Sequence, residues 1–169
     1  MSTTPKLVRK TVVAVKTETT QGSAATIAET DFMLAEGDVA LKPAVEMLER
    51  DHYRTSLDSI ASVAGLRSYE CTIKTEIKGS GVAGTAYAPL GALLQACGFT
   101  ETDGASNVVY TPSSTAVTNF FGPGKSCTIE IFKDGIKHQL VGCMGNVKAV
   151  LEDGKYGYFE FAMKGVYAA

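Results

Sequence analysis

Two Asp-Gly dipeptides near the end of the chain constrain its fold more than any other feature. Asp-Gly is the strongest short signal for the tight turn of a β-hairpin. The two dipeptides separate apolar segments, with Asp134-Gly135 between residues 127–133 and 136–143, and Asp153-Gly154 between 145–152 and 155–164. In the last segment Gly157, Phe159, Phe161 and Met163 recur at every second position and so share one face of a strand. The sequence therefore predicts two consecutive antiparallel hairpins.

Residues 66–78 form the clearest single strand of the sequence. Tyr69, Cys71, Ile73 and Ile77 fall on one side of an extended chain. The intervening side chains are polar or charged, which predicts a strand buried on one face and wet on the other. The polar face consists of Ser68, Glu70, Thr72, Lys74, Glu76 and Lys78.

Shorter β patterns precede and follow this strand, at residues 7–16, 31–35, 38–50 and 108–111. Pro43 lies within the third of these, so we expect that strand to lie at a sheet edge or to be broken there.

The best helix pattern is PLGALLQAC at residues 89–97, where Leu90, Leu93, Leu94 and Cys97 form an apolar face. Pro89 suits a first helical turn and Gly98 suits a stop. The fold class expected is mainly β, a β-sandwich or partly rolled barrel with one flanking α-helix. We expect a single domain over residues 1–169, with an N-terminal arm at about 1–6 and long loops at 17–31 and 51–65.

Composition excludes several classes of protein. The chain holds 16 basic and 18 acidic residues, a net charge of −2, so it is not a generally basic nucleic-acid binder. No apolar stretch approaches the roughly 18 residues of a membrane span, and the chain is expected to be soluble and made in the cytosol. The widely spaced cysteines and two isolated histidines predict neither a metal site nor disulfides. These residues are Cys71, Cys97, Cys127, Cys143, His52 and His138.

One motif has the spacing of a dinucleotide-binding loop, Gly79-Ser80-Gly81-Val82-Ala83-Gly84, with Glu101 or Asp103 about twenty residues later. In that fold the helix begins inside the glycine motif and the preceding strand is buried on both faces. Here Pro89 marks a later helix start, and the preceding strand alternates with charges. The motif is interpreted as a connecting loop, and no cofactor, catalytic residue or enzymatic activity is expected.

The charges near the N-terminus are segregated by sign. Residues 6–16 carry four positive charges and no negative one, and residues 17–41 carry five negative charges and no positive one. Two interpretations remain open: chance segregation in a short chain, or an arm of one subunit that meets an acidic patch on the next.

The order of these elements resembles the tail tube proteins (major tail proteins) of long-tailed bacteriophages. The resemblance covers about residues 11–167 and is most specific at residues 84–99, from GTA to PLGALLQACGF. Its other parts are the TETTQGSAAT segment after the first strand, Glu49-Arg50-Asp51, the GSGVAGTA loop, the hairpin at Asp134-Gly135 and the closing Gly165-Val166-Tyr167.

The resemblance implies a structural virion protein that forms stacked hexameric rings, the tail tube through which DNA passes into the host. It implies no cofactor or metal, and it implies self-association together with contacts to tape measure, tail terminator and distal tail proteins. The location implied is the virion tail, after assembly in the host bacterial cytoplasm, without membrane insertion. DNA would pass the lumen without specific binding.

Site residues follow from the same resemblance. The candidate lumen face is Glu70, Thr72, Lys74, Glu76 and Lys78, and the candidate inter-ring contacts are Asp51, Arg54, Leu57, Asp58, Ile60 and Val63. Two alternatives remain: another β-rich virion component, such as a tail completion or decoration protein, and a small-molecule-binding β-barrel.

Overall fold

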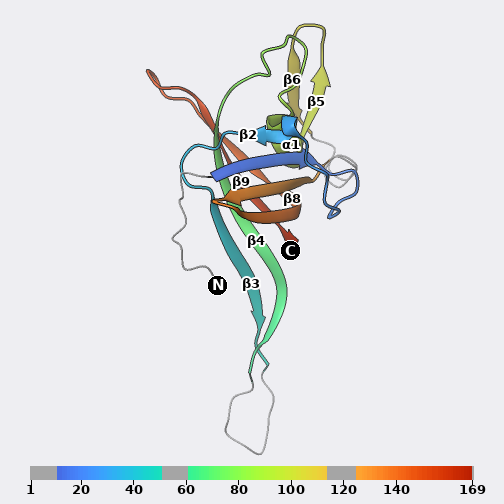
Figure 1. Cartoon of the computed structure of the whole chain (residues 1–169), viewed down its shortest axis with the longest axis vertical. Helices are drawn as coiled ribbons and strands as arrows, with labels where there is room; N and C mark the ends of the chain where they lie inside the picture. The colour runs from blue at the N-terminus through green and yellow to red at the C-terminus, as the bar shows by residue number, and fades with distance from the viewer. Residues whose placement is uncertain (1–10, 51–60, 114–124, 169) are drawn as a thin grey trace, which may run out of the picture.

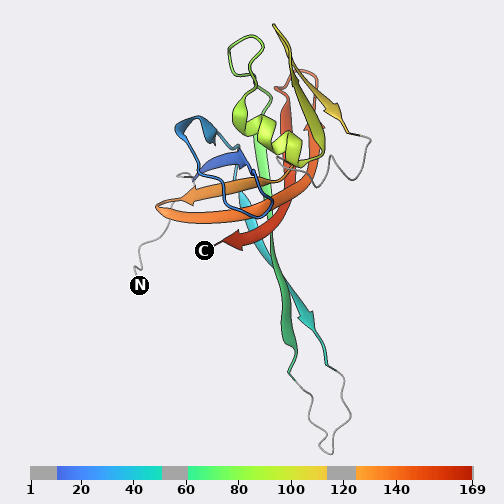
Figure 2. The same cartoon turned by 90° about the vertical axis from the view of Figure 1, so that its right-hand side faces the viewer.

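A computed structural model of the chain describes residues 11–50, 61–113 and 125–168. Over these residues it contains a seven-stranded antiparallel sheet, a separate two-stranded sheet and one α-helix (Figures 1 and 2). The expected fold, mainly β with one flanking helix, is confirmed. In chain order the elements are β1 (Thr11–Thr17), the 3-10 turn η1 (Glu29–Asp31), β2 (Phe32–Met33), β3 (Ala40–Leu48), β4 (Val63–Glu76), α1 (Ala88–Ala96), β5 (Phe99–Asp103), β6 (Val108–Pro112), β7 (Cys127–Lys133), β8 (Ile136–Val150) and β9 (Tyr158–Ala168).

The main sheet is open, with the order β2-β1-β7-β8-β9-β4-β3. In Figure 1, β1 and β7 run across the body of the molecule, whereas β3 and β4 run along its longest axis. Strand β8 connects these two directions. Its first half, up to Cys143, pairs with β7, whereas β9 pairs along both halves, with a register shift between Val141 and Met144.

Gly142 allows the bend in β8. Its φ angle is +63°, a backbone conformation that residues with a Cβ atom rarely adopt. The sequence predicted two strands here, at 136–143 and 145–152, because Gly142 and Gly145 interrupt the apolar pattern. That prediction is wrong, since the chain continues through a bulge as one strand.

The first predicted hairpin is confirmed, because Lys133 pairs with Ile136 and both turn residues, Asp134 and Gly135, have positive φ. The second hairpin is confirmed in its pairing but has a longer connection, since the last pair is Val150 with Tyr158. Strand β5 was missed, because its charged and hydroxyl side chains, TETD after Phe99, have no apolar alternation.

The core lies between one face of the main sheet and α1. Leu90, Leu93 and Leu94 of the helix are buried, as predicted, and they join the inward side chains of the strands. Cys71, Ile73 and Phe161 lie on the same buried face of β4 and β9. Among the described residues, no helix is both long and apolar enough to cross a membrane.

Candidate assembly surfaces

Strands β3 and β4 extend beyond the rest of the sheet as a two-stranded ribbon. Strand β9 pairs with β4 only between Tyr69 and Glu76. Residues 63–68 of β4 therefore pair only with residues 44–48 of β3 in the part of the chain that the structure describes. We call these two segments the ribbon, and Figures 1 and 2 show it leaving the body along the longest axis of the molecule.

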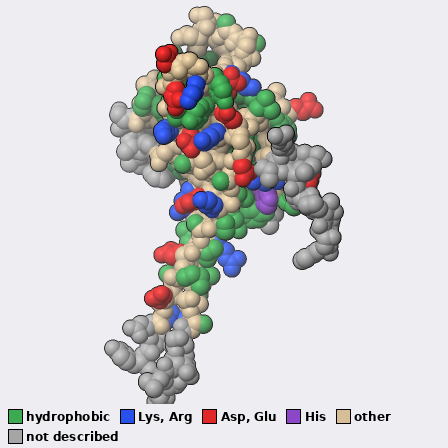
Figure 3. All heavy atoms as spheres, turned by 90° about the vertical axis from the view of Figure 1, so that its left-hand side faces the viewer, with side chains coloured by type: hydrophobic (Ala, Val, Ile, Leu, Met, Phe, Trp, Pro, Cys, Tyr) green, Lys and Arg blue, Asp and Glu red, His purple; other side chains and the backbone are tan. Residues whose placement is uncertain are grey.

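The ribbon exposes large apolar side chains. Leu66 is 71% exposed and Met47 is 56% exposed, far more than a packed sheet would allow. Figure 3 shows hydrophobic side chains along the ribbon, interspersed with charged ones. A two-stranded hairpin without a packed face is marginal in water, so this arrangement indicates a surface that another protein covers. The exposed apolar members are Val45, Met47, Leu48, Val63 and Leu66.

Most of the candidate inter-ring contacts lie outside the described residues, namely Asp51, Arg54, Leu57, Asp58 and Ile60. Val63 is described, and it is an exposed residue of β4 that pairs with Leu48. The predicted C-terminal boundary of the loop at 51–65 is therefore wrong, because β4 already begins at Val63. The sequence placed the strand start at Leu66, since Val63, Ala64 and Gly65 have no alternating pattern.

Four of the five residues of the candidate lumen face lie in β4 and form a polar surface there. Glu70, Thr72, Lys74 and Glu76 share the face of β4 opposite the core, as the alternation predicted. Lys78 is an exception, because β4 ends at Glu76. The Lys78 ammonium instead lies 5.1 Å from the centre of the Tyr87 ring, in the segment that leads to α1.

This polar face continues onto the neighbouring strands with charges of alternating sign. One cross-strand row is Lys42, Glu70 and Lys164, and the next is Lys74, Glu160 and Lys148. In the second row, Lys74 Nζ lies 3.9 Å from Glu160 Oε1. Opposite charges at directly facing positions are favourable, and each glutamate of these two rows is flanked by two lysines. The rows therefore hold four lysines and two glutamates, and Glu76 adds a third negative charge to the same face.

A buried carboxylate, Glu18, holds the loop after β1 against the sheet. The side chain is 1% exposed, and it accepts four hydrogen bonds. The donors are Gly22 N at 2.8 Å, Ser126 Oγ at 2.6 Å, Thr128 Oγ1 at 2.9 Å and Gly142 N at 2.8 Å. Four donors satisfy a carboxylate fully, so its role is structural.

The segregated charges near the N-terminus meet partners within the chain. Lys16 Nζ lies 3.0 Å from Asp31 Oδ2, and Lys133 Nζ lies 3.2 Å from Asp38 Oδ1. Two of the five acidic residues in 17–41 are thus already paired, and the other three basic residues of 6–16 lie outside the described part of the chain.

The glycine motif at 79–84 lies in the connection between β4 and α1, and the helix begins later, at Ala88. The motif lines a cavity of about 340 Å³ together with residues 106–108 and Tyr110. Glu101, considered above as an acidic partner of this motif, lies against the helix instead, since a Cβ at Gly91 would meet Glu101 Oε2 at 2.4 Å. That oxygen is buried and has no hydrogen-bond partner. Burial raises the pKa of Tyr110, and the neighbouring Glu101 carboxylate raises it further.

The cysteines have the environment of core residues. Cys71, Cys127 and Cys143 are buried and Cys97 is half-buried, and all four are free thiols. Burial raises the pKa of Cys71 to about 12 and that of Cys97 to about 12, which suppresses the reactive thiolate. Within the described ranges, no group of three or more His, Cys, Asp and Glu side chains is placed to hold a metal ion.

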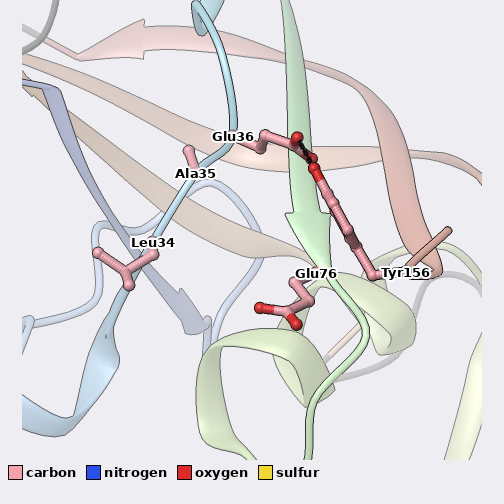
Figure 4. Close-up of a pocket in the computed structure, with 5 residues that line it drawn as sticks. All are labelled: Leu34, Ala35, Glu36, Glu76 and Tyr156. Atoms are coloured by element: carbon pink, nitrogen blue, oxygen red, sulfur yellow. Dashed lines mark hydrogen bonds between the residues drawn. The ribbon is translucent and has the colours of Figure 1, made fainter.

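A second exposed apolar cluster lies at the far end of β4, where Leu34, Ala35, Glu36, Glu76 and Tyr156 line a cavity of about 280 Å³ (Figure 4). The Tyr156 hydroxyl donates a hydrogen bond to Glu36, and this bond raises the pKa of Tyr156. The alternation in β4 placed Glu76 correctly, but the sequence carried no signal that Leu34 and Tyr156 lie beside it.

Solved structures of two gene transfer agent particles contain chains similar to this one. No protein family and no curated protein matches the sequence. One similar solved structure is the virion of a native gene transfer agent particle, with 12% identity, a TM-score of 0.47, and 93% of this chain and 95% of that chain covered. Another is the tail of an empty gene transfer agent particle with C6 symmetry, with 15% identity, a TM-score of 0.47, and 93% and 96% coverage.

Proposed function

We propose that this chain is a structural subunit of a phage-type tail tube, which assembles into stacked hexameric rings that conduct DNA into a host. The observation that carries the proposal is the ribbon, which extends beyond the sheet and exposes five large apolar side chains. In a monomer these apolar side chains stay in water and add no stability, whereas a self-assembling subunit buries them between copies. The resemblance of the sequence to tail tube proteins supplies the kind of assembly.

The open edges of the main sheet support the same proposal. Strand β3 is an edge of nine residues, and Pro43 removes one backbone donor from it. Exposed edges of this length are a hazard for a monomer, because they can pair with the edge of another sheet. Joining sheets around a ring removes such edges.

The polar face of β4, β9 and β8 is the proposed wall of the lumen. On these three strands the face holds three lysines and three glutamates, so the wall has little net charge to attract phosphates. They are Lys74, Lys148, Lys164, Glu70, Glu76 and Glu160. Glu70, Thr72, Lys74 and Glu76 are the residues of β4 that we assign to this wall, with DNA passing without specific binding. Lys78 is not assigned, because it follows the strand.

The proposal includes no enzymatic role and no cofactor. Partners in a tail would be further copies of the chain, the tape measure, tail terminator and distal tail proteins, in a virion assembled in the host cytoplasm. A small-molecule-binding barrel is less favoured, because side chains of the sheet and of α1 fill the space on the inner face of the sheet.

Light scattering coupled to size-exclusion chromatography, followed by negative-stain microscopy, tests the proposal directly. Rings with sixfold symmetry, or tubes built from them, are expected as the concentration rises. Leu66→Lys should prevent their formation while leaving the thermal midpoint of the monomer unchanged, because the side chain is exposed. The matched control is Val109→Lys, an exposed apolar residue of β6 away from the ribbon. A chain that stays monomeric at all salt concentrations, and in the presence of tail initiation complexes, would overturn the proposal.

A further inference from the structure

Cys127 and Cys143 lie directly opposite each other in the main sheet, although 16 positions separate them in the sequence. They are cross-strand partners in the register of β7 and β8. Both side chains belong to the core, both are fully buried, and both are free thiols. Their spacing in the sequence concealed this pairing, because it depends on the hairpin at Asp134-Gly135 and on the bulge in β8.

The register holds the two backbones at a separation that suits a disulfide. Directly opposed residues of antiparallel strands have Cα atoms about 4.5–5.5 Å apart, and disulfides join Cα atoms about 4.4–6.8 Å apart. Each sulfur also contacts the strand of the other. The Cys127 thiol donates a hydrogen bond to Cys143 O at 3.7 Å. Burial raises the pKa of Cys143, and a hydrogen bond from the backbone of Ile129 in β7 lowers it in part.

The other two cysteines are not placed to join this pair. Cys71 lies on β4, and β9 separates that strand from β8 in the sheet. Neighbouring strands lie about 4.8 Å apart, so β4 and β8 are roughly 10 Å apart, beyond the reach of a disulfide. Cys97 follows the last residue of α1, and its sulfur lies 3.9 Å from Met163 Sδ of β9. The fold therefore singles out one pair among the four cysteines.

Burial protects this pair while the sheet is closed. Neither side chain is exposed to solvent, and burial raises the pKa of Cys127 well above its ordinary value, so little thiolate forms. Cys127 is, however, the first residue of β7. Strand ends open more readily than strand centres, and a β-hairpin can form in the folding chain before the core closes around it. Folding and local opening are thus the two occasions on which a small oxidant reaches the pair.

We propose that Cys127 and Cys143 are a site of reversible oxidation, at which a low-molecular-weight disulfide such as oxidised glutathione converts the two thiols into a cross-strand disulfide. One cysteine thiolate attacks a sulfur of the oxidant, which forms a mixed disulfide and releases one glutathione. The second cysteine attacks the protein sulfur of that mixed disulfide and displaces the other glutathione. The protein loses two electrons and two protons, and the oxidant is reduced to two thiols.

The bridge joins β7 to β8 beside the bulge at Gly142. It closes the hairpin loop covalently and so restricts the unfolded chain, which stabilises the folded state. Disulfides are rare in a reducing cytosol and persist in oxidising surroundings. A chain that folds in the first and acts in the second gains stability after its release. The inference rests on the pairing of β7 with β8 and does not depend on the proposed tube.

Refolding from urea in a buffer of oxidised and reduced glutathione tests the site. The variant Cys71→Ala/Cys97→Ala keeps only the proposed pair, and the matched control Cys127→Ala/Cys143→Ala keeps only the other two cysteines. Folded monomer is isolated by size-exclusion chromatography, alkylated with iodoacetamide in denaturant, digested and analysed by mass spectrometry. The first variant should lack two hydrogen atoms and give one peptide pair joined through Cys127 and Cys143. The control should stay reduced and take up two alkyl groups.

The wild-type chain decides the result if a variant does not fold. It should carry the same single bridge, with Cys71 and Cys97 alkylated. Its urea midpoint should be higher in the oxidised form than after reduction with dithiothreitol, whereas the midpoint of the control variant should not respond to dithiothreitol. Four alkylated cysteines, glutathione adducts without a bridge, or a bridge through Cys71 or Cys97 would each overturn the inference. A bridge that lowers the urea midpoint would overturn it as well, because the strands would then not hold the pair at the separation of a disulfide.

Discussion

Glu18 and Gly142 lie 124 residues apart in the sequence, yet the glycine N–H donates a hydrogen bond of 2.8 Å to Glu18 Oε1. Gly142 has a positive φ and lies in the bulge of β8, where the register with β9 shifts. The carboxylate therefore supports the bend, and its other bonds fix the start of β7 and the loop after β1.

Glu18→Gln should destabilise the fold by about 2–5 kcal/mol, since hydrogen bonds to charged groups are strong and two of the four donors would lose their acceptor oxygen. The amide nitrogen of glutamine would also place a donor against these two donors. Urea unfolding of the monomer measures the change. Glu152→Gln is the control, because Glu152 is exposed and should change the free energy of unfolding by less than about 0.5 kcal/mol. Equal unfolding midpoints for the two variants would show that Glu18 does not support the fold.

Leu93→Ala should cost about 2–5 kcal/mol, because the side chain is fully buried between α1 and the sheet and its removal leaves a cavity. Thermal or urea unfolding measures this loss. Val82→Ala removes an exposed apolar side chain and serves as the control. If Leu93→Ala behaved like Val82→Ala, the helix would not be part of the core.

Gly145→Ala should destabilise the pairing of β8 with β9. A Cβ at this position would meet Ala162 O at 2.1 Å and Met163 Cα at 2.8 Å, both of which belong to backbone that cannot move aside. Overpacking of this kind costs about 1–3 kcal/mol or more. Gly79→Ala is the matched control, with nothing within 4 Å of the new methyl group. Unfolding midpoints that agree within error would contradict the close approach of the two strands.

Stability should fall in alkaline solution because of the buried thiols. A thiol in the unfolded chain ionises near pH ~8.5, whereas burial raises the pKa of Cys71 and of Cys97 to about 12. The unfolded state therefore binds fewer protons than the folded state between these values, and the free energy of unfolding decreases as pH rises. Below the pKa of the thiols in the unfolded chain, both states bind the proton and the stabilisation from the two buried thiols is fully present.

Urea unfolding in a series of buffers from neutral to strongly alkaline pH measures this decrease. The double variant Cys71→Ala/Cys97→Ala should show a shallower decrease than the wild type. Iodoacetamide labelling of the native protein provides a second measurement, and Cys71 should react far more slowly than an exposed thiol. Rapid native labelling of Cys71 would contradict its assigned environment.

The elements predicted correctly are those whose conformation depends on neighbouring residues in the sequence. Asp134-Gly135 specifies its turn, and the alternation in 66–78 specifies which face of β4 is wet. Pro89 and the leucines that follow it specify α1. Each of these signals lies within one element, so the sequence alone was sufficient.

Features that depend on distant partners were missed. The segment 17–31 has the composition of a loop with little to bury, yet Glu18 and Asp31 in it are buried and bonded. Three donors to Glu18, from Ser126, Thr128 and Gly142, come from the far end of the chain. Asp31 instead meets nearer partners, the backbone N–H of Ala28 and the ammonium of Lys16. The ribbon exists because β9 stops pairing at Tyr69, and nothing in residues 63–68 indicates where a partner strand ends. The cavity at the end of β4 likewise brings together Leu34 and Tyr156, which are 122 positions apart and have no local signal.

The unlike ends of β4 have a consequence for how a polymer of this chain would grow. If the ribbon of one copy docks on an unlike surface of the next, every growing column presents a bare ribbon at one terminus and the unlike surface at the other. The two termini are then different chemical targets, and a factor that recognises one does not recognise the other. A starting complex could offer one kind of surface to the first copy, and a stopping protein could cover the remaining kind. Direction of growth and final length would thus be encoded in a single strand.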